Sequence, residues 1–270
     1  LPFRIVIGFI KPRKILGMAF SGEIKSIGKK VKNFKVGDKV FGSNEFEMSC
    51  HAEYVCTPEN GLISIKPENK SHEEAAALYF GSNTSLSFFK KGNIQAGQKV
   101  LIYGASGSLG TAAIQLAKHF GAEVTAVCST ANLDLVKAIG ADKVIDYTKE
   151  NFVDNGEKYD IIYETVGKAR FSDCLRLLKK NGYFLRAVHL TMLSILRGIW
   201  VKLTTSKKVI GGIATTKPED LHFLKELFEN GNINPVIDKT YALEEIADAY
   251  RHVDNGHKKG NVVISVVKNK

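Results

Sequence analysis

Hydrophobic and polar positions follow two different patterns along the chain, and the change between them predicts two kinds of domain. Residues 1–70 contain short β-rich apolar runs separated by glycine and lysine, which predict strands. Residues 99–228 alternate short unbroken apolar runs with segments that are apolar at helical spacing. This second pattern is typical of a doubly wound parallel sheet, whose strands are buried on both faces.

The two patterns predict individual elements. The first predicts strands at 15–20, 22–27, 39–41, 52–56 and 62–65. The second predicts strands at 100–103, 124–128, 144–147, 159–163, 183–188 and 208–213, with helices at 133–139, 171–178 and 218–228. Between them, Ser71 to Glu74 resembles a capping box before an alanine-rich helix that breaks near Gly81. The tail predicts a helix at 243–252 and a strand at 262–267.

The stretch 99–130 carries the strongest chemical signal. A buried strand ends at Tyr103, and Gly104, Gly107 and Gly110 follow at intervals of three before an apolar helical pattern. Glycines in this position allow a tight turn, close approach of the backbone to a pyrophosphate and close packing of helix on strand. The helix amides and dipole then face an anion. The strand–turn–helix context therefore predicts a dinucleotide site rather than an ordinary loop.

The end of the second strand indicates which dinucleotide binds. A site for NAD usually has Asp or Glu there, whereas this chain has Cys128, Ser129, Thr130, Ala131 and Asn132. Small hydroxyl residues leave room for a 2′-phosphate, so the sequence favours NADP(H), with Ser129, Thr130 and Asn132 as candidate contacts. Alternatively, Ser129 or Thr130 caps the helix that begins near Asn132, and the two roles are compatible.

Composition narrows the partners and the compartment. The chain has 270 residues and a formal charge of +10, but its lysines occur as separated pairs without interleaved aromatics. We therefore expect a solvated basic surface that helps to attract a polyanionic cofactor, and no nucleic-acid partner. The four cysteines, at 50, 56, 128 and 174, form no CxxC pair, which favours reduced thiols and a cytoplasmic protein.

One apolar segment, 188–204, holds the only tryptophan. It is too short to span a bilayer, and His189, Arg197 and Lys202 interrupt it, so we expect no stable membrane insertion. A lid over a cleft or a subunit contact is the favoured interpretation, and a membrane-surface helix is the alternative. The chain begins with Leu1 rather than Met, so its targeting is not indicated.

Three ordered motifs resemble one known family. They are GMAFSGEIKSIGKKVKNFKVGDKVFG at 17–42, the turn at 103–110 with VIDYT at 144–148, and NPVIDKTYALEEIADAYRHVDNGHKKGNVVIS at 234–265. Together they resemble the zinc-independent branch of the medium-chain dehydrogenase/reductase superfamily, and within it the quinone oxidoreductases and enone reductases. The resemblance covers essentially the whole chain.

The resemblance implies an α/β fold: a Rossmann-type doubly wound parallel sheet plus a GroES-like β-rich domain formed by both chain ends. The implied domains are 1–80, 81–233 and 234–270, the last returning to the first. The implied activity is NADPH-dependent hydride transfer, without metal, to a small-molecule quinone or α,β-unsaturated carbonyl, in a homodimer. Two alternatives stay open: a medium-chain alcohol dehydrogenase-like enzyme, and a cofactor-binding redox sensor without turnover.

The resemblance also assigns site residues, none of them catalytic. Thr84 lies on the nicotinamide side, and Ser106, Gly107, Ser108 and Leu109 hold the pyrophosphate. Ser129 and Tyr147 line the 2′-phosphate, although Tyr147 at a strand end could simply pack. The remaining implied contacts are Val166, Gly167, Gly211, Gly212 and Ile213 at the nicotinamide end, and Lys259 and Asn261 from the C-terminal part.

Several residues depart from the family pattern. Ala131 stands where relatives often carry a basic residue, Asn261 where lysine is common, and Glu164 where Asp usually precedes the Val-Gly turn. The opening part of the pattern, which supplies a substrate-side Asn and Tyr, is missing. Zinc-dependent relatives place a His-Glu pair where this chain has Met18 and Ala19. Cys50 and Cys56 stand alone, so we expect no metal site.

Overall fold

The computed structural model describes residues 14–154, 156–188, 197–198, 200–201 and 203–266. The chain forms two compact units. One, the outer unit, ends at Phe80 and resumes at Lys217, and the other, the middle unit, is Gly81–Thr216. The sequence placed the second boundary at residue 233 instead. The middle unit ends earlier because α7 (Pro218–Glu229) packs on a strand of the outer unit, β3 (Leu62–Ile65).

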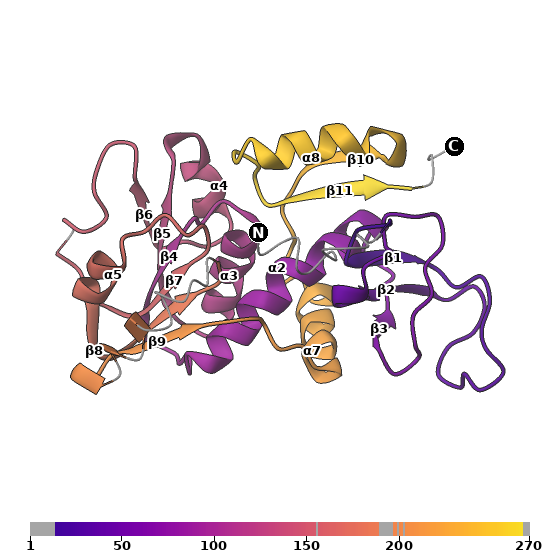
Figure 1. Cartoon of the computed structure of the whole chain (residues 1–270), viewed down its shortest axis with the longest axis horizontal. Coiled ribbons are helices and arrows are strands. Elements are labelled where there is room, and N and C mark those ends of the chain that lie inside the picture. The colour runs from indigo at the N-terminus through magenta and orange to yellow at the C-terminus, as the bar shows by residue number, and fades with distance from the viewer. Residues whose placement is uncertain (1–13, 155, 189–196, 199, 202, 267–270) are drawn as a thin grey trace. The chain divides into compact units, whose positions relative to one another are not determined.

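The middle unit contains a six-stranded parallel sheet in the order β6-β5-β4-β7-β8-β9 (Figure 1). Its strands are β4 (Lys99–Tyr103), β5 (Glu123–Cys128), β6 (Lys143–Asp146), β7 (Tyr159–Glu164), β8 (Leu178–Arg186) and β9 (Lys208–Gly211). The connecting helices include α3 (Ser108–His119), α4 (Leu133–Ala138) and α5 (Phe171–Leu177). This is the doubly wound α/β arrangement that the sequence predicted.

The central strands are buried because their apolar runs face helices on both sides. Val100, Leu101 and Ile102 of β4 have no exposed surface. In register, Tyr103 lies opposite Val127 of β5 and Glu164 of β7, so three neighbouring strands end at the same level. The carboxyl ends of parallel strands are where such folds bind ligands. The glycine turn therefore begins at the edge where a cofactor is expected.

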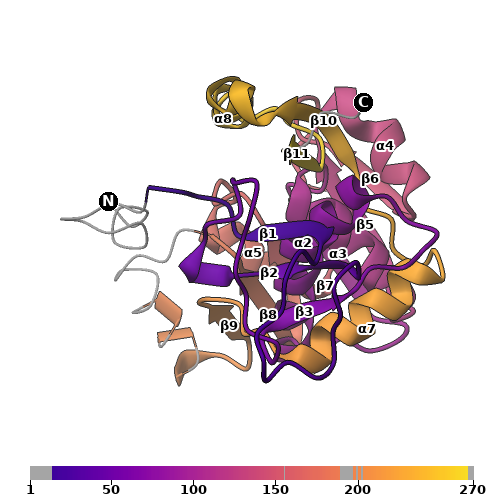
Figure 2. The same cartoon turned by 90° about the vertical axis from the view of Figure 1, so that its right-hand side faces the viewer.

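The outer unit holds two small sheets. In the first, β1 (Ala19–Glu23), β2 (Lys39–Ser43) and β3 pair antiparallel, and Figure 2 shows α7 beside β3. In the second, β10 (Ile237–Ala242) and β11 (Asn261–Ser265) pair in parallel, joined by α8 (Ile246–Asp254).

Three local predictions for the outer unit were wrong. One strand, β1, replaces the two strands expected at 15–20 and 22–27, and residues 52–56 form no strand. Strand β10 was not predicted. It pairs with β11, a contact between residues more than twenty positions apart, and that pairing is not visible in the local pattern.

Helix α2 (His72–Lys91) shows both a confirmed and a wrong prediction. The capping box is present: the Ser71 N–H donates to Glu74 Oε2 at 2.8 Å, and the Glu74 N–H donates to Ser71 Oγ at 3.1 Å. The helix does not break at Gly81. A Cβ at Gly81 would lie 2.5 Å from the carbonyl oxygen of Ser108, so glycine is needed here for close packing on the start of α3.

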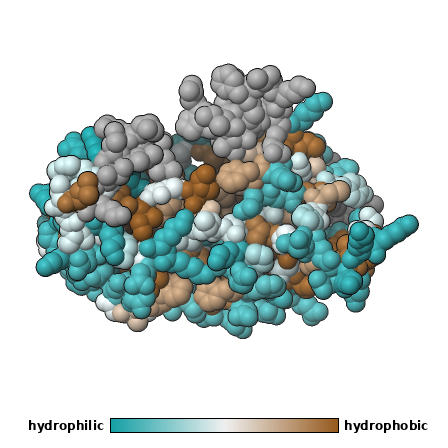
Figure 3. Space-filling model, turned by 60° about the horizontal axis from the view of Figure 1, so that its bottom comes forward, coloured by the Kyte–Doolittle hydropathy of each residue, from teal (hydrophilic) through white to brown (hydrophobic). Residues whose placement is uncertain are grey.

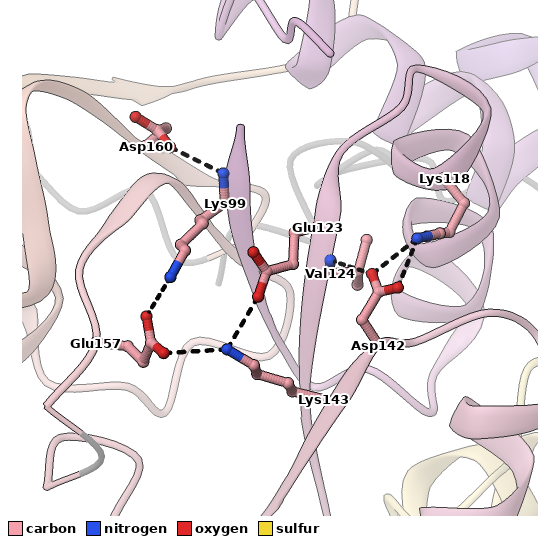
Figure 4. A network of polar contacts seen from close by, with 8 residues as sticks. All are labelled: Lys99, Lys118, Glu123, Val124, Asp142, Lys143, Glu157 and Asp160. Atoms are coloured by element: carbon pink, nitrogen blue, oxygen red, sulfur yellow. Dashed lines mark hydrogen bonds and ion pairs between the residues drawn. The ribbon is translucent and has the colours of Figure 1, made fainter. Parts of the chain in front are cut away.

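A network of ion pairs lies at the amino-terminal ends of β4, β5 and β6 (Figure 4). Glu157 accepts from Lys99 Nζ at 2.6 Å and from Lys143 Nζ at 3.0 Å, and Lys143 Nζ also lies 2.9 Å from Glu123 Oε1. The hydrogen bond from Lys99, together with that from Lys143, lowers the pKa of the Glu157 carboxyl to about 2.

Replacing Glu157 with glutamine should therefore destabilise the protein in a pH-dependent way. Because the folded pKa is about 2 against an ordinary value of 4.5, the carboxylate stabilises the fold above pH 4.5, and this contribution is lost as the pH falls toward 2. Thermal melts should give E157Q a lower Tm at pH 7 and no deficit near pH 2. E150Q is the matched control, because Glu150 is exposed and makes no ion pair in the described part of the chain. An equal loss in E150Q would contradict this prediction.

The surface is mostly polar. On the face shown in Figure 3, hydrophilic residues predominate and hydrophobic ones form small separate patches. Among the residues that the structure describes, no helix combines the length and hydrophobicity required to cross a membrane. The predicted apolar segment 188–204 is described only at residues 188, 197, 198, 200, 201, 203 and 204.

Candidate cofactor site

The glycine turn is attached to the neighbouring strand β5. The N–H groups of Gly104 and Ala105 both donate to the carbonyl oxygen of Val127, at 3.1 and 3.0 Å. Gly104 has a φ of +82°, and a Cβ there would lie 2.6 Å from Thr165 Oγ1. Glycine is thus required twice at this position, by the left-handed backbone and by the side chain of the adjoining loop.

The other two glycines have different roles. A Cβ at Gly110 would lie 2.3 Å from the carbonyl oxygen of Gly104, so this glycine lets helix α3 pack on the turn. Gly107, the N-cap of α3, has a φ of −79°, and the nearest protein atom to a Cβ there is 3.7 Å away. Neither a left-handed backbone nor packing requires glycine at 107. Glycine is a favoured N-cap residue, and here it also allows close approach of a ligand.

Backbone donors at the start of α3 fit an anion. The N–H of Thr111 donates to the carbonyl oxygen of Gly107 at 2.9 Å, but those of Ser106, Leu109 and Gly110 have no acceptor within the described residues. Unsatisfied amides at a helix N-terminus, together with the helix dipole, attract a phosphate group. The predicted pyrophosphate contacts 104–110 therefore fit a dinucleotide in both shape and donor chemistry.

Asn132 joins the glycine turn to the end of β5. Its Nδ2 donates to Ser106 Oγ and to Ser129 Oγ, both at 3.1 Å, and its Oδ1 is buried without a partner in the described structure. The helix-capping role considered for Ser129 is confirmed in position only, and Thr130 follows the N-cap. Ser129 is the N-cap of a short 3-10 helix, η2 (Thr130–Asn132), but makes no side-chain cap bond.

An acid missed by the sequence argument lies at this corner. Asp146 ends β6 and is buried, and it accepts from Thr130 Oγ1 at 2.5 Å and from Thr148 Oγ1 at 2.7 Å. The hydrogen bond from Thr130 is the largest cause that lowers the pKa of the Asp146 carboxyl. The VIDYT motif contains this residue, but the NAD pattern predicts an acid only at the end of β5. Asp146 arrives from the neighbouring strand.

Tyr147 lies at the same corner. Its N–H donates to the carbonyl oxygen of Cys128 at 3.1 Å, and its side chain is 52% exposed. The residue therefore follows the end of β6 beside the end of β5, where Ser129 begins. A half-exposed side chain fits both the packing alternative, in which the hydroxyl reaches water, and a ligand contact, so the role of Tyr147 stays a prediction.

Glu164 shapes the predicted nicotinamide end. Its Oε1 accepts from the N–H groups of Val166 at 3.1 Å, Gly167 at 2.5 Å and Lys168 at 3.1 Å. Glu164 is only 1% exposed, and its Oε2 has no hydrogen-bond partner in the described structure. The longer acid noted in the sequence as a departure is thus the residue that folds the Val-Gly turn.

The remaining candidate cofactor-binding residues of the middle unit lie at the end of β9, in the loop after it and on α2. Gly211 ends β9, Gly212 has a φ of +139°, and Ile213 is 66% exposed. The carbonyl oxygen of Ile213 accepts from Lys91 Nζ at 3.0 Å, which ties this loop to the end of α2. Thr84 lies half-buried on the same helix.

Lys259 and Asn261 belong to the outer unit and have partners there. The Lys259 N–H donates to Asp238 Oδ2 at 3.1 Å, and Asn261 Nδ2 donates to the carbonyl oxygen of Val236 at 3.0 Å. The structure thus gives each a local partner, and their contact with the cofactor stays a prediction.

The residues at the position of the zinc-dependent His-Glu pair do not fit a metal centre. Met18 and Ala19 offer no imidazole or carboxylate ligand, and Cys50 Sγ donates to the carbonyl oxygen of Met18 at 3.3 Å. The described residues contain no group of three or more His, Cys, Asp or Glu placed to hold a metal ion.

Comparison with known proteins shows the family of this chain. The family described as "Alcohol dehydrogenase GroES-like domain" matches residues 4–67, and the one described as "Zinc-binding dehydrogenase" matches residues 139–264. "Quinone-oxidoreductase QR1, chloroplastic" of Triphysaria versicolor is 32% identical over 90% of this chain and 77% of its own length. The chain belongs to the quinone oxidoreductase-like medium-chain dehydrogenases/reductases.

Other members of this superfamily cover the chain similarly. A "2-methylene-furan-3-one reductase" of Solanum lycopersicum is 33% identical, and an "NADPH-dependent alkenal/one oxidoreductase, chloroplastic" of Arabidopsis thaliana is 30% identical, each over 92% of this chain. The chain spans 62% and 63% of the lengths of these two relatives. A solved quinone oxidoreductase from Coxiella burnetii superimposes with a TM-score of 0.87 at 29% identity, covering 97% of this chain and 82% of its own.

Proposed function

We propose that this chain is an NADPH-dependent oxidoreductase that transfers hydride to a quinone or an α,β-unsaturated carbonyl. The observation that carries the proposal is the glycine turn, where neither a left-handed φ nor packing requires glycine at 107 and donors at the start of α3 lack acceptors. Relatives named as alkenal, furanone and quinone reductases support the acceptor class.

In this proposal the chain binds and orients both reactants. The bound nicotinamide supplies the hydride. The backbone amides of 106–110 bind the pyrophosphate, and the turn at 166–168, folded by Glu164, lines the nicotinamide end together with Gly211, Gly212 and Ile213. Catalysis then comes mainly from holding donor and acceptor in reacting geometry in a site that excludes water.

Preference for the 2′-phosphate is the finer part of the proposal. Ser129 offers a hydroxyl at the end of β5 and Tyr147 is exposed beside it, whereas Thr130 already donates its hydroxyl proton to Asp146. Both oxygens of Asp146 already accept hydrogen bonds from Thr130 and Thr148. A carboxylate so engaged is poorly placed to bind a ribose 2′-hydroxyl, which favours NADP(H) over NAD(H).

A titration with NADPH and with NADH, followed by nucleotide fluorescence, tests this preference. We expect tighter binding of NADPH, and we expect high salt to weaken NADPH more than NADH because the 2′-phosphate adds charge. Equal or tighter binding of NADH would overturn the 2′-phosphate assignment. Nucleotide binding without oxidation by quinones or enals would instead indicate a redox sensor without turnover.

The compartment and the assembly are also proposals. The four cysteines are all free, and burial raises the pKa of the Cys128 thiol to about 11 and that of Cys174 to about 12. Free thiols, including the exposed Cys56, fit a reducing compartment, and we propose the cytoplasm. We also propose a homodimer, which light scattering at micromolar protein concentration would test.

A further inference from the structure

One stretch of the sequence carries almost all of the net charge. Residues 174–218 contain no Asp or Glu and nine Lys or Arg, whereas the other 225 residues contain 29 Lys and Arg against 28 Asp and Glu. The nine are Arg176, Lys179, Lys180, Arg186, Arg197, Lys202, Lys207, Lys208 and Lys217. The spacing of the lysines along the chain does not reveal this asymmetry, because the unusual feature is that residues 174–218 lack Asp and Glu.

The structure brings part of this stretch together at the starts of β8 and β9. Lys207 Nζ donates to the carbonyl oxygen of Leu175 at 2.6 Å, near the end of α5. The Asn181 N–H donates to Ser206 Oγ at 3.4 Å, in the first part of β8. The residues just before β9 therefore lie against the junction of α5 and β8.

Several bases at this junction lack a carboxylate partner. Arg176, Lys180 and Lys208 are exposed and make no ion pair within the described structure. Lys208 Nζ donates to the Tyr183 hydroxyl, a neutral partner, at 2.8 Å. Lys179 is the exception, since it pairs with Asp160 at 2.7 Å.

Two large apolar side chains are exposed on the helical residues that lead into the junction. Trp200 is 62% exposed and Leu203 is 79% exposed, while Val201 between them is fully buried. Residues three apart share one helix face, so Trp200 and Leu203 project together. We name Arg176, Lys180, Trp200, Leu203 and Lys208 the β8–β9 surface.

We propose that the β8–β9 surface binds the headgroups of an anionic lipid bilayer. Exposed Trp and Leu flanked by Lys and Arg, in a stretch of sequence without acids, are the composition of segments that lie at a membrane interface. Each base near such a surface contributes about five-fold to partitioning, equivalent to about 1 kcal/mol. The binding is peripheral.

Charge and area favour a bilayer over other anionic partners. A stable protein interface buries roughly 800 Å² of surface on each partner. The two apolar side chains provide far less surface area than that. A nucleic acid would bind the Lys and Arg side chains of this surface but would leave the exposed Leu203 without a contact. A bilayer uses both, because apolar insertion and electrostatic attraction add. The surface lies at the amino-terminal ends of the strands, away from the glycine turn, so the proposal does not depend on the proposed function.

Vesicle binding tests the proposal directly. The full chain is mixed with vesicles of phosphatidylcholine alone or with equal amounts of phosphatidylglycerol, and binding is followed by sedimentation and by fluorescence of Trp200, the only tryptophan. We expect a blue shift with the anionic vesicles only. The double variant K180E/K208E should bind more than about twenty-fold more weakly. L203N should lose the blue shift.

The matched control is K29E/K30E, which makes the same change in net charge at two exposed lysines of the outer unit. It should bind like the unchanged protein, and all variants should keep their nucleotide affinity and Tm. Equal losses in both double variants would overturn the proposal, because net charge alone would then explain binding. A blue shift without vesicles at high protein concentration would also overturn it. So would the absence of vesicle binding together with binding to a DNA oligonucleotide that L203N leaves unchanged.

Discussion

Replacing Gly107 with alanine should weaken nucleotide binding by ten-fold or more, which is about 1.4 kcal/mol or above, and should lower fold stability only by the roughly 1 kcal/mol that alanine costs at a helix N-cap. The added Cβ meets no protein atom closer than 3.7 Å, and the φ of −79° is open to alanine. The methyl group would instead occupy the space that the pyrophosphate backbone contact requires. Isothermal titration with NADPH, beside thermal melts, measures the two effects separately.

Two alanine variants frame this result. G110A should lower Tm, because its Cβ would lie 2.3 Å from the Gly104 carbonyl oxygen and must displace backbone. G22A should change neither binding nor Tm, since no atom lies within 4 Å of a Cβ there. If G107A bound NADPH as tightly as the unchanged protein, the turn would be a structural feature only, and the proposed function would lose its main support.

Replacing Glu164 with alanine should cost stability on the order of 3 kcal/mol, because three backbone N–H groups would lose their shared acceptor. The turn at 166–168 would lose the contact that fixes it, so hydride transfer should fall more than nucleotide affinity. Urea unfolding, nucleotide titration and turnover with a quinone measure the three quantities.

Glutamine at 164 separates the acceptor from the charge. E164Q keeps one carbonyl oxygen to accept the three bonds and replaces the unpartnered Oε2 with an amide nitrogen. We expect E164Q to retain most of the stability that E164A loses. A loss in E164Q as large as that in E164A would show that the negative charge, rather than the acceptor geometry, holds the turn.

The sequence determined the architecture of the middle unit. Its strands and helices were predicted within a few residues, because a run buried on both faces and a helical period are local properties. The glycine turn was equally predictable, since strand, glycines and helix are contiguous. The capping box at Ser71 was local in the same sense.

Tertiary structure decided the features that depend on distant residues. Asp146 and Thr130 are sixteen residues apart in the sequence, and they meet only because β6 lies beside β5. Gly81 stays inside α2 because helix α3 packs against it, although a glycine in isolation predicts a break. Strand β10 exists because β11 pairs with it.

The same division applies to charge. The sequence held every base of the β8–β9 surface, but whether separated lysines form one surface depends on how the chain folds around them. Local patterns determine which elements form, because they depend on neighbours along the chain. The packing of those elements determines which polar groups meet, because hydrogen bonds and ion pairs act over a few ångströms in space.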